Sequence, residues 1–223
     1  MPHCQRRSAL KLLGIATSLA LGGWLAAGLL PAAADTQVTV PPEKLFAPQA
    51  LPDIVQGKAD APVTIVEYAS MTCPHCARFH AETYPALLSK YVDTGKVRFI
   101  LREFPLDPRA AAAFMLARCA GDGDKRTAVI DLLFNSQQTW AESDKPLDTL
   151  ADLMRQTGMS AKDFDSCLND QKLYTNVIKE RDDAGKDFSI EATPTFFING
   201  TKYSGEISID ALSKIIDPLL AKK

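Results

Sequence analysis

Two cysteines stand three positions apart in the segment 70–79, which reads SMTCPHCARF. Cys73 and Cys76 could bind a metal ion, attach a haem, form an inert structural disulfide or exchange disulfides with other thiols. Haem attachment requires a histidine directly after the second cysteine, and Ala77 occupies that position. A structural zinc site requires two more ligands; His80 is near, but no second C-x-x-C pair follows. The ligand count therefore favours redox chemistry.

The residues around the pair have the properties that stabilise a thiolate, the nucleophile of disulfide exchange. A strand pattern precedes Cys73 and a helical pattern follows it, so helix N–H groups and the helix dipole would act on its sulfur. Pro74 costs no hydrogen bond at the first helical position. His75 adds a donor or a positive charge, which lowers a thiol pKa. Cys76 lies one helical turn from Cys73, and the pattern predicts a redox-active pair.

The segments around this pair predict a unit of strand, helix and strand. Residues 63–69 and 97–101 are rich in β-branched and apolar side chains, as in buried strands. Residues 77–92 have apolar side chains at helical spacing, and Pro85 is expected to kink or interrupt that helix. A helical crossover of this length predicts that the two strands are parallel and that the unit is right-handed.

A long helical segment is predicted next, and strands return only near the end of the chain. No segment within 104–187 has a convincing strand pattern. Residues 195–198 form a strand pattern, Asn199-Gly200 is typical of a type I′ hairpin turn, and 208–220 has the pattern of an amphipathic helix. The helices predicted within 104–187 cover 108–120, 125–138, 146–157, 161–168 and 173–186.

The first 34 residues have the three-part pattern of a secretory signal peptide. Arg6, Arg7 and Lys11 precede an uncharged stretch that ends in Ala32-x-Ala34, which predicts cleavage before residue 35. An uncleaved membrane anchor is the alternative. The pattern leaves both Sec export and twin-arginine (Tat) export open, because the match to a Tat signal is incomplete. Residues 35–62 are predicted to be an extended lead-in with one edge strand at 38–40.

The overall composition excludes few classes of protein function. The chain of 223 residues is 46% hydrophobic and has a formal net charge of −2, with no charge block that indicates nucleic-acid binding. Cleavage at residue 34 would also remove Cys4 and leave four cysteines. In an exported protein an even number of cysteines permits disulfides. We therefore predict a structural disulfide between Cys119 and Cys167, with two buried free thiols as the alternative.

Two segments resemble one family of redox enzymes. EYASMTCPHCARFH at 67–80 and ATPTFFING at 192–200 are similar to the DsbA-type periplasmic thiol:disulfide oxidoreductases of the thioredoxin superfamily. The resemblance extends from about Leu51 to the end of the chain. It implies an α/β thioredoxin fold (βαβ…ββα) at 63–103 and 188–223, with an all-helical insertion at 104–187 between the halves.

The resemblance also implies roles for individual residues. Cys73 would be the exposed nucleophile and Cys76 the buried resolving thiol. Thr193 and Pro194 would form a cis-proline loop that binds substrate, although base rates alone favour a trans proline. Glu67 would lie beneath the site and help to move the proton of Cys76.

Some of these residues have plainer alternatives. Glu67 could instead form a salt bridge with Lys58 or Lys96. We expect His80 to be a solvated helix residue. Met71 and Phe79 are candidates for an apolar surface around the disulfide, with core packing as the alternative.

The function implied is oxidation of folding secreted proteins through a mixed disulfide on Cys73. No cofactor beyond the Cys73–Cys76 disulfide and no metal is expected, and a DsbB-like membrane quinone reductase would re-oxidise the pair. We expect a periplasmic monomer that does not bind nucleic acid. Thr193 is common at this place in disulfide isomerases, so an isomerase or reductase is an alternative, although residues 36–51 are too short for the dimerisation domain of such isomerases. A non-catalytic chaperone or metal-binding module is the alternative outside enzymes.

Overall fold

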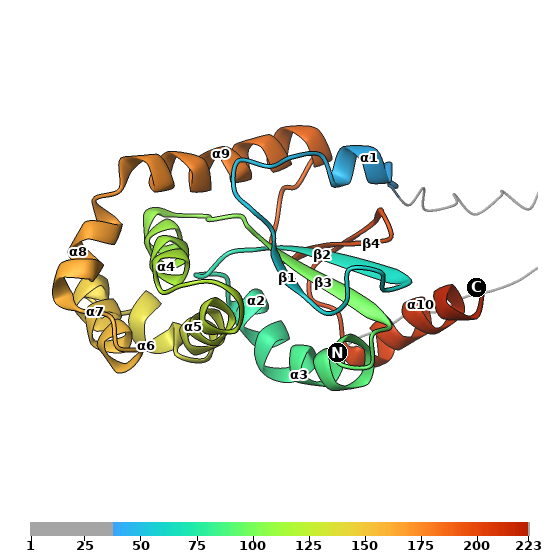
Figure 1. Cartoon of the computed structure of the whole chain (residues 1–223), viewed down its shortest axis with the longest axis horizontal. Coiled ribbons are helices and arrows are strands. Elements are labelled where there is room, and N and C mark those ends of the chain that lie inside the picture. The colour runs from blue at the N-terminus through green and yellow to red at the C-terminus, as the bar shows by residue number, and fades with distance from the viewer. Residues whose placement is uncertain (1–37, 223) are drawn as a thin grey trace, which may run out of the picture. The chain divides into compact units, whose positions relative to one another are not determined.

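One mixed sheet forms the centre of the computed structural model, which describes residues 38–222 (Figure 1). Its strand order is β1-β3-β2-β4-β5. Strands β2 and β3 are parallel, whereas β1 with β3, β2 with β4 and β4 with β5 are antiparallel. The strands are β1 (Ile54–Gln56), β2 (Val63–Ala69), β3 (Val97–Glu103), β4 (Thr195–Ile198) and β5 (Thr201–Ser204).

The central strand β2 is covered on both faces, which explains its nearly continuous apolar sequence. Ile65 and Ala69 belong to the larger of two apolar clusters. Val66 and Tyr68, whose side chains alternate with these, belong to the second cluster on the opposite face. Glu67 stands two positions after Ile65 on β2, so its side chain points to the same face of the sheet, toward the larger cluster.

The segment after β2 is helical, as predicted, but its α-helical hydrogen bonding is interrupted by two π-helical turns. It runs through α2 (Pro74–Arg78), the π-helical turn η1 (Phe79–Thr83), α3 (Tyr84–Leu87) and a second π-helical turn η2 (Leu88–Val92). Pro85 lies between the two π-helical turns and lacks the N–H that an α-helical bond requires. The predicted interruption at Pro85 is therefore confirmed. Helix α10 (Ile209–Ala221) lies beside α3 on the same side of the sheet (Figure 1).

The predicted hairpin turn between β4 and β5 is also confirmed. Asn199 and Gly200 both have positive φ, 46° and 88°, as a type I′ turn requires. A Cβ at Gly200 would lie 2.4 Å from the carbonyl oxygen of Val40. This close approach, as well as the positive φ, restricts the position to glycine.

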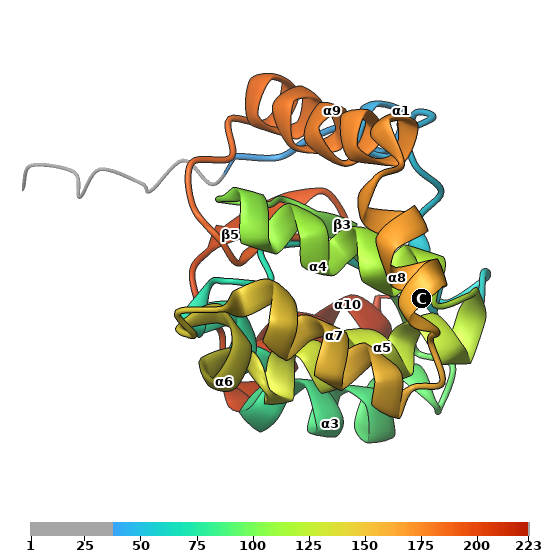
Figure 2. The same cartoon turned by 90° about the vertical axis from the view of Figure 1, so that its left-hand side faces the viewer.

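Six helices connect β3 to β4, and no strand occurs between Glu103 and Thr195 (Figure 2). Asp107 and Ser160 cap two of them by accepting hydrogen bonds from the N–H groups of Ala110 and Asp163. Five of these helices match the predicted segments apart from their ends. The short helix at 137–141 was not predicted, because the segment predicted at 125–138 runs across Ser136, where the first of the two helices ends. The helices are α4 (Pro108–Cys119), α5 (Gly123–Asn135), α6 (Gln137–Ala141), α7 (Pro146–Gln156), α8 (Ala161–Leu168) and α9 (Gln171–Phe188).

Helix α9 and the short helix α1 (Pro42–Leu45) cover the second face of the sheet (Figure 1). A buried cation holds this layer together. The Arg102 guanidinium donates to Asp53 Oδ1 at 2.7 Å, to the Leu45 carbonyl at 2.9 Å and to the Tyr68 hydroxyl at 2.7 Å. The acceptors of this buried charge lie on three different segments, and their hydrogen bonds offset the cost of burying it.

The segment before β2 differs from the prediction. Residues 38–40 form only an isolated bridge, Thr39 with Thr201, rather than an edge strand. The strand β1 lies within the predicted lead-in and was not predicted. Its three residues follow Pro52 and precede Gly57, so they are too few to produce an alternating pattern. The predicted signal peptide, residues 1–34, lies outside the described residues; within 38–222 no helix is long and apolar enough to span a bilayer.

A disulfide joins Cys119 at the end of α4 to Cys167 in α8, as predicted. The two cysteines are 48 positions apart and their Cα atoms are 6.1 Å apart. Together with Phe164, also from α8, Cys167 belongs to the larger apolar cluster. The bridge therefore attaches a peripheral helix to the helix that follows β3.

We predict that Cys119→Ala with Cys167→Ala lowers the free energy of unfolding by about 2–4 kcal/mol, because the unfolded chain regains the freedom of a long loop. Chemical denaturation measures the loss. The matched background is Cys73→Ser with Cys76→Ser, in which a reductant can break only the Cys119–Cys167 bond. Reductant should lower the stability of that background protein. It should not change the stability of the variant that carries all four cysteine substitutions. Equal stability of all forms would contradict a structural role for the bridge.

Candidate active site

Cys73 lies at the junction of strand and helix, at the N-cap of α2, with Pro74 as the first helical residue. In this structure Cys73 and Cys76 are both thiols. The Cys73 thiol donates a hydrogen bond to the Thr193 carbonyl oxygen at 3.1 Å. Cys73 is only 5% exposed, so the expectation of an exposed nucleophile is wrong for this conformation. The loop at Thr193 packs against the sulfur and covers it.

Hydrogen bonds lower the pKa of the Cys73 thiol from 9.0 to about 5. The largest contribution is the hydrogen bond from the Cys76 thiol, and burial opposes it. The Thr193 side chain and the backbone N–H groups of Cys76 and His75 lower the pKa further. These N–H groups are the free donors at the start of α2. The position of Cys73 at the N-cap of α2 and the lowered pKa agree with the predicted stabilisation of its thiolate by the helix start.

Cys76 has the opposite electrostatic environment. Its side chain is fully buried. Burial raises its pKa well above 9.0, and the hydrogen bond to Cys73 and the charge of Glu67 raise it further. Near neutral pH the pair consequently holds one thiolate, on Cys73, and one thiol, on Cys76.

The Thr193–Pro194 peptide bond is cis, as the family resemblance implied. The Pro194 carbonyl accepts a hydrogen bond from the Gly205 N–H at 2.8 Å, which connects the loop to the end of β5. The Thr193 hydroxyl is buried and makes no hydrogen bond of regular geometry with residues 38–222. It thus contributes to the polar surroundings of the Cys73 sulfur without a fixed partner of its own.

Glu67 lies under the pair and binds a residue that the sequence analysis placed in solvent. The Glu67 Oε2 atom lies 2.9 Å from His80 Nε2, and both side chains are buried. The expectation of a solvated His80 is wrong, because η1 turns this residue toward the sheet. The His80 ring stacks on Phe134 of α5, with the ring centroids 4.1 Å apart. Glu67 therefore pairs with a histidine rather than with Lys58 or Lys96.

His75 affects Cys73 through its backbone N–H, while its side chain points to the surface. Arg78 donates to His75 Nδ1 at 2.8 Å and, through Nε, to Glu206 Oε2, also at 2.8 Å. His75 Nδ1 lies 3.3 Å from the same carboxylate oxygen. The hydrogen bond from Arg78 lowers the pKa of Glu206. This exposed group of three side chains borders the nucleophile.

Gln137, the first residue of α6, holds the backbone of the active-site loop. Its Nε2 atom donates to the carbonyls of Met71 and Cys73 at 2.8 and 2.9 Å, and its side chain is buried. In the described part of the chain Gln137 is the donor to the Met71 carbonyl, whereas the Cys73 carbonyl also accepts from the Ala77 N–H at 3.1 Å. The sequence analysis missed this residue, because nothing in its local sequence indicates a contact more than 60 positions away.

A second set of polar contacts joins the active-site loop to the start of the helical insertion. Thr72 Oγ1 donates to Asp107 Oδ2 at 2.6 Å, and the other carboxylate oxygen of Asp107 caps α4. The exposed apolar side chain of this region is Leu106, which is 52% exposed. Met71 and Phe79, the predicted surface residues, are both fully buried. Their side chains pack in the larger cluster.

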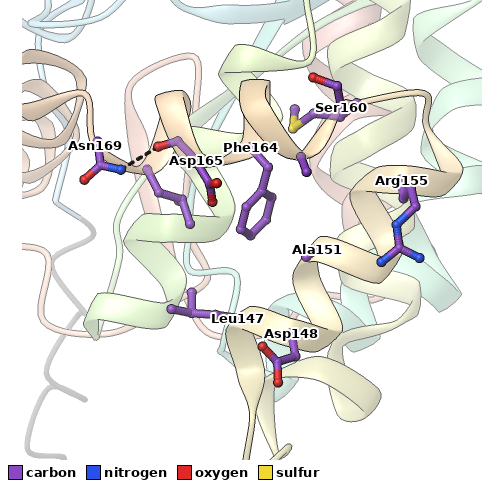
Figure 3. A pocket seen from close by; sticks show the side chains of 11 residues that line it. Leu147, Asp148, Ala151, Arg155, Ser160, Phe164, Asp165 and Asn169 are labelled. Atoms are coloured by element: carbon purple, nitrogen blue, oxygen red, sulfur yellow. Dashed lines mark hydrogen bonds between the residues drawn. The ribbon is translucent and has the colours of Figure 1, made fainter.

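The best-defined pocket of the described residues lies away from the cysteines. This pocket of about 490 Å³ opens between α7 and α8, and Figure 3 shows Phe164 and Ala151 pointing into it. None of the predicted site residues lines it. Within residues 38–222 no cluster of three or more His, Cys, Asp and Glu side chains could hold a metal ion.

Comparison with known proteins finds relatives whose names refer to disulfide exchange, in agreement with the paired thiols at Cys73 and Cys76. The family model described as Thioredoxin matches residues 49–218. A protein of Rickettsia conorii named "Putative protein-disulfide oxidoreductase" is 36% identical over 171 residues, which cover 77% of this chain and 61% of that protein. The chain therefore spans less than two thirds of the length of the first curated relatives it matches.

Solved structures show the same architecture over most of the chain. The crystal structure of Wolbachia pipientis alpha-DsbA1 has a TM-score of 0.75 and 32% identity, over 81% of this chain and 96% of that one. Oxidised BdbD from Bacillus subtilis has a TM-score of 0.65 at 23% identity, over 83% of this chain and 98% of that one, and shares the fold. The predicted α/β thioredoxin fold with a helical insertion is confirmed.

We predict that the Cys73 thiolate, followed by its ultraviolet absorbance in the reduced protein, titrates with a midpoint near pH 5. In the unfolded chain the thiol titrates near 9.0. The lowered pKa therefore stabilises the reduced fold fully above pH 9, progressively less as the pH falls, and not at all below about 5. Cys76→Ala removes the largest cause and should raise the midpoint. A midpoint near 9 in the unaltered protein would contradict the assigned environment.

We predict that Gln137→Leu lowers the free energy of unfolding by about 1–3 kcal/mol, because the buried Met71 carbonyl loses its donor and the Cys73 carbonyl keeps only the Ala77 N–H. It should also raise the pKa of Cys73, since the N-cap backbone is no longer held. Gln138→Leu is the matched control, because residue 138 is the exposed neighbour on the same helix, and its effect should stay within about 0.5 kcal/mol. Denaturation and thiolate titration measure both quantities. Equal behaviour of the two variants would show that Gln137 does not position the loop.

Proposed function

Because this chain belongs to the thioredoxin family, within its DsbA-type branch, we propose that it is a thiol:disulfide oxidoreductase that donates its Cys73–Cys76 disulfide to folding polypeptides. The observation that carries the proposal is the lowered pKa of Cys73 at the start of α2. Whatever stabilises the Cys73 thiolate stabilises the reduced enzyme. A stable reduced form makes the disulfide a strong oxidant.

The proposed reaction has two exchange steps. A substrate thiolate attacks the Cys73 sulfur, the bond to Cys76 breaks, and Cys76 leaves with the electron pair and takes up a proton. A second substrate thiolate then attacks the substrate sulfur of the mixed disulfide, and Cys73 leaves as a thiolate. The substrate is oxidised by two electrons and the enzyme is reduced by two. The low pKa of Cys73 favours it as the leaving group in the second step.

The cis-proline loop supports a binding mode for the substrate chain. We assign to Thr193 and Pro194 the role of pairing with an extended polypeptide beside Cys73, in the manner of an added strand. The Thr193 carbonyl lies 3.1 Å from the Cys73 sulfur, so a chain paired there would place its own sulfur next to the nucleophile. Leu106 offers an exposed apolar contact near this site.

The proposed setting is the periplasm of a Gram-negative cell, reached by means of the predicted signal at 1–34. The Cys119–Cys167 disulfide supports an oxidising compartment. The enzyme would act as a monomer with no cofactor beyond its own disulfide, and a DsbB-like membrane quinone reductase would re-oxidise Cys73 and Cys76. Its substrates would be unfolded or partly folded secreted proteins.

Thr193 favours a second candidate, a disulfide isomerase of the same fold. Its hydroxyl is buried beside the Cys73 sulfur and contributes to lowering the pKa. A polar group at this position would affect how fast a mixed disulfide resolves, and isomerisation depends on that rate. Reactivation of scrambled ribonuclease without an added oxidant would favour the isomerase.

We predict that the purified protein, equilibrated with glutathione buffers and trapped by alkylation, has a reduction potential near −120 mV, the value of a strong disulfide donor. A value near −270 mV, typical of thioredoxin, would contradict the oxidase proposal. Cys73→Ser should abolish the oxidation of reduced ribonuclease. If Cys73→Ser retained full activity in the cell, a non-catalytic binding module would replace the enzyme proposal.

A further inference from the structure

The proposed reaction, on which this inference rests, leaves a proton to be supplied deep in the protein. Cys76 leaves as a thiolate when a substrate attacks Cys73, yet its sulfur is fully buried. Burial and the charge of Glu67 raise the pKa of Cys76 well above 9.0. A thiol with a high pKa is a poor leaving group unless a proton reaches it. Because solvent has no access to Cys76, the proton must come through the protein.

Two buried groups lie on the side of the sheet that Cys76 faces. Glu67 from β2 and His80 from η1 share a hydrogen bond of 2.9 Å, and their side chains are 0% and 2% exposed. The second atom of each group, Glu67 Oε1 and His80 Nδ1, has no hydrogen-bond partner among residues 38–222. A carboxyl group and an imidazole that share a hydrogen bond can pass a proton between them. Each also has a second polar atom that can take up or release a proton, so the two groups are the components of a proton relay. A purely structural ion pair would be expected to have its remaining atoms satisfied.

A partly exposed carboxylate lies on the far side of His80. Asp131 Oδ1 of α5 lies 4.0 Å from His80 Nδ1, and the Asp131 side chain is 40% exposed. The other groups around the imidazole do not supply such an exit. Phe134 stacks on its face. Tyr84 of α3 lies at a ring distance of 4.6 Å, and burial raises the pKa of its phenol, so it stays protonated.

The family resemblance already implies that Glu67 helps to move the Cys76 proton. We propose that His80 and Asp131 extend this route from Glu67 to solvent. When the Cys73–Cys76 bond breaks, Cys76 takes the electron pair and receives a proton from the Glu67–His80 pair. A proton from solvent then returns to the pair by way of Asp131. In the reverse direction, when Cys76 attacks a mixed disulfide on Cys73, its proton leaves along the same path. His80 and Asp131 do not touch the reacting sulfurs; they act through Glu67, by passing it a proton or accepting one from it.

Asp131 allows a test that leaves the core intact. Asp131→Asn removes the proton acceptor at the exit, Asp131→Glu keeps a carboxylate, and Asp124→Asn changes an exposed acid of the same helix as a matched control. The measurement is the rate at which dithiothreitol reduces the Cys73–Cys76 disulfide, divided by the concentration of the attacking thiolate, from pH 5 to 9. Thermal unfolding and the solvent deuterium isotope effect are measured on the same proteins.

We expect Asp131→Asn to lower the corrected rate about 10-fold, a modest loss for proton transfer because water partly replaces the exit group. Its pH profile and solvent isotope effect should change, its unfolding temperature should not, and Asp131→Glu should restore most of the rate. Asp124→Asn should match the unaltered protein. His80→Gln, which keeps a hydrogen bond to Glu67 but cannot relay a proton, should lose at least as much rate as Asp131→Asn.

Equal corrected rates and isotope effects for Asp131→Asn and Asp124→Asn would overturn the relay. A loss in Asp131→Asn that came only with a lower unfolding temperature, and without a changed pH profile, would also overturn it in favour of a structural role. Neither result would affect the proposed function, which is tested separately by the reduction potential of the unaltered protein and by the Cys73→Ser variant.

Discussion

A negative charge on the Cys73 sulfur is the interaction on which the rest of the site depends. The sulfur is nearly buried, and burial alone would disfavour the thiolate. The Cys76 thiol, the Thr193 side chain and the N–H groups of His75 and Cys76 together outweigh that cost. Apart from the Thr193 side chain, which belongs to the cis-proline loop, these donors come from the start of a helix, where N–H groups have no partner within the helix. The strand–helix junction and the cis-proline loop exist at this place to bring such donors to one atom.

The second sulfur requires the opposite environment within one helical turn. Cys76 faces the sheet, where Glu67 and the apolar cluster disfavour its charge. The alternation of β2 places Glu67 on that face. The two sulfurs of such a pair behave differently in exchange: Cys73 leaves easily as a thiolate, whereas Cys76 must exchange a proton with its surroundings.

The helical insertion holds this arrangement from the side. Gln137 donates to two carbonyls of the active-site loop, and Asp107 accepts from Thr72 while it caps α4. The same insertion supplies Phe134 and Asp131 around His80. Cys119–Cys167 fixes α8 to α4. The insertion is therefore part of the active site, although none of its residues provides a reacting sulfur.

The sequence alone determined the features that depend on neighbours in the chain. The C-P-H-C segment between a strand and a helix pattern located the thiolate, the Asn199-Gly200 turn located the hairpin, and caps and apolar spacing located the insertion. The tertiary structure decided where distant segments meet. It buried Met71 and Phe79, turned His80 onto Glu67, brought Gln137 to the loop and paired the three-residue strand β1 with β3. Local patterns report the periodicity of one segment, whereas burial and polar pairing depend on which other segment packs against it.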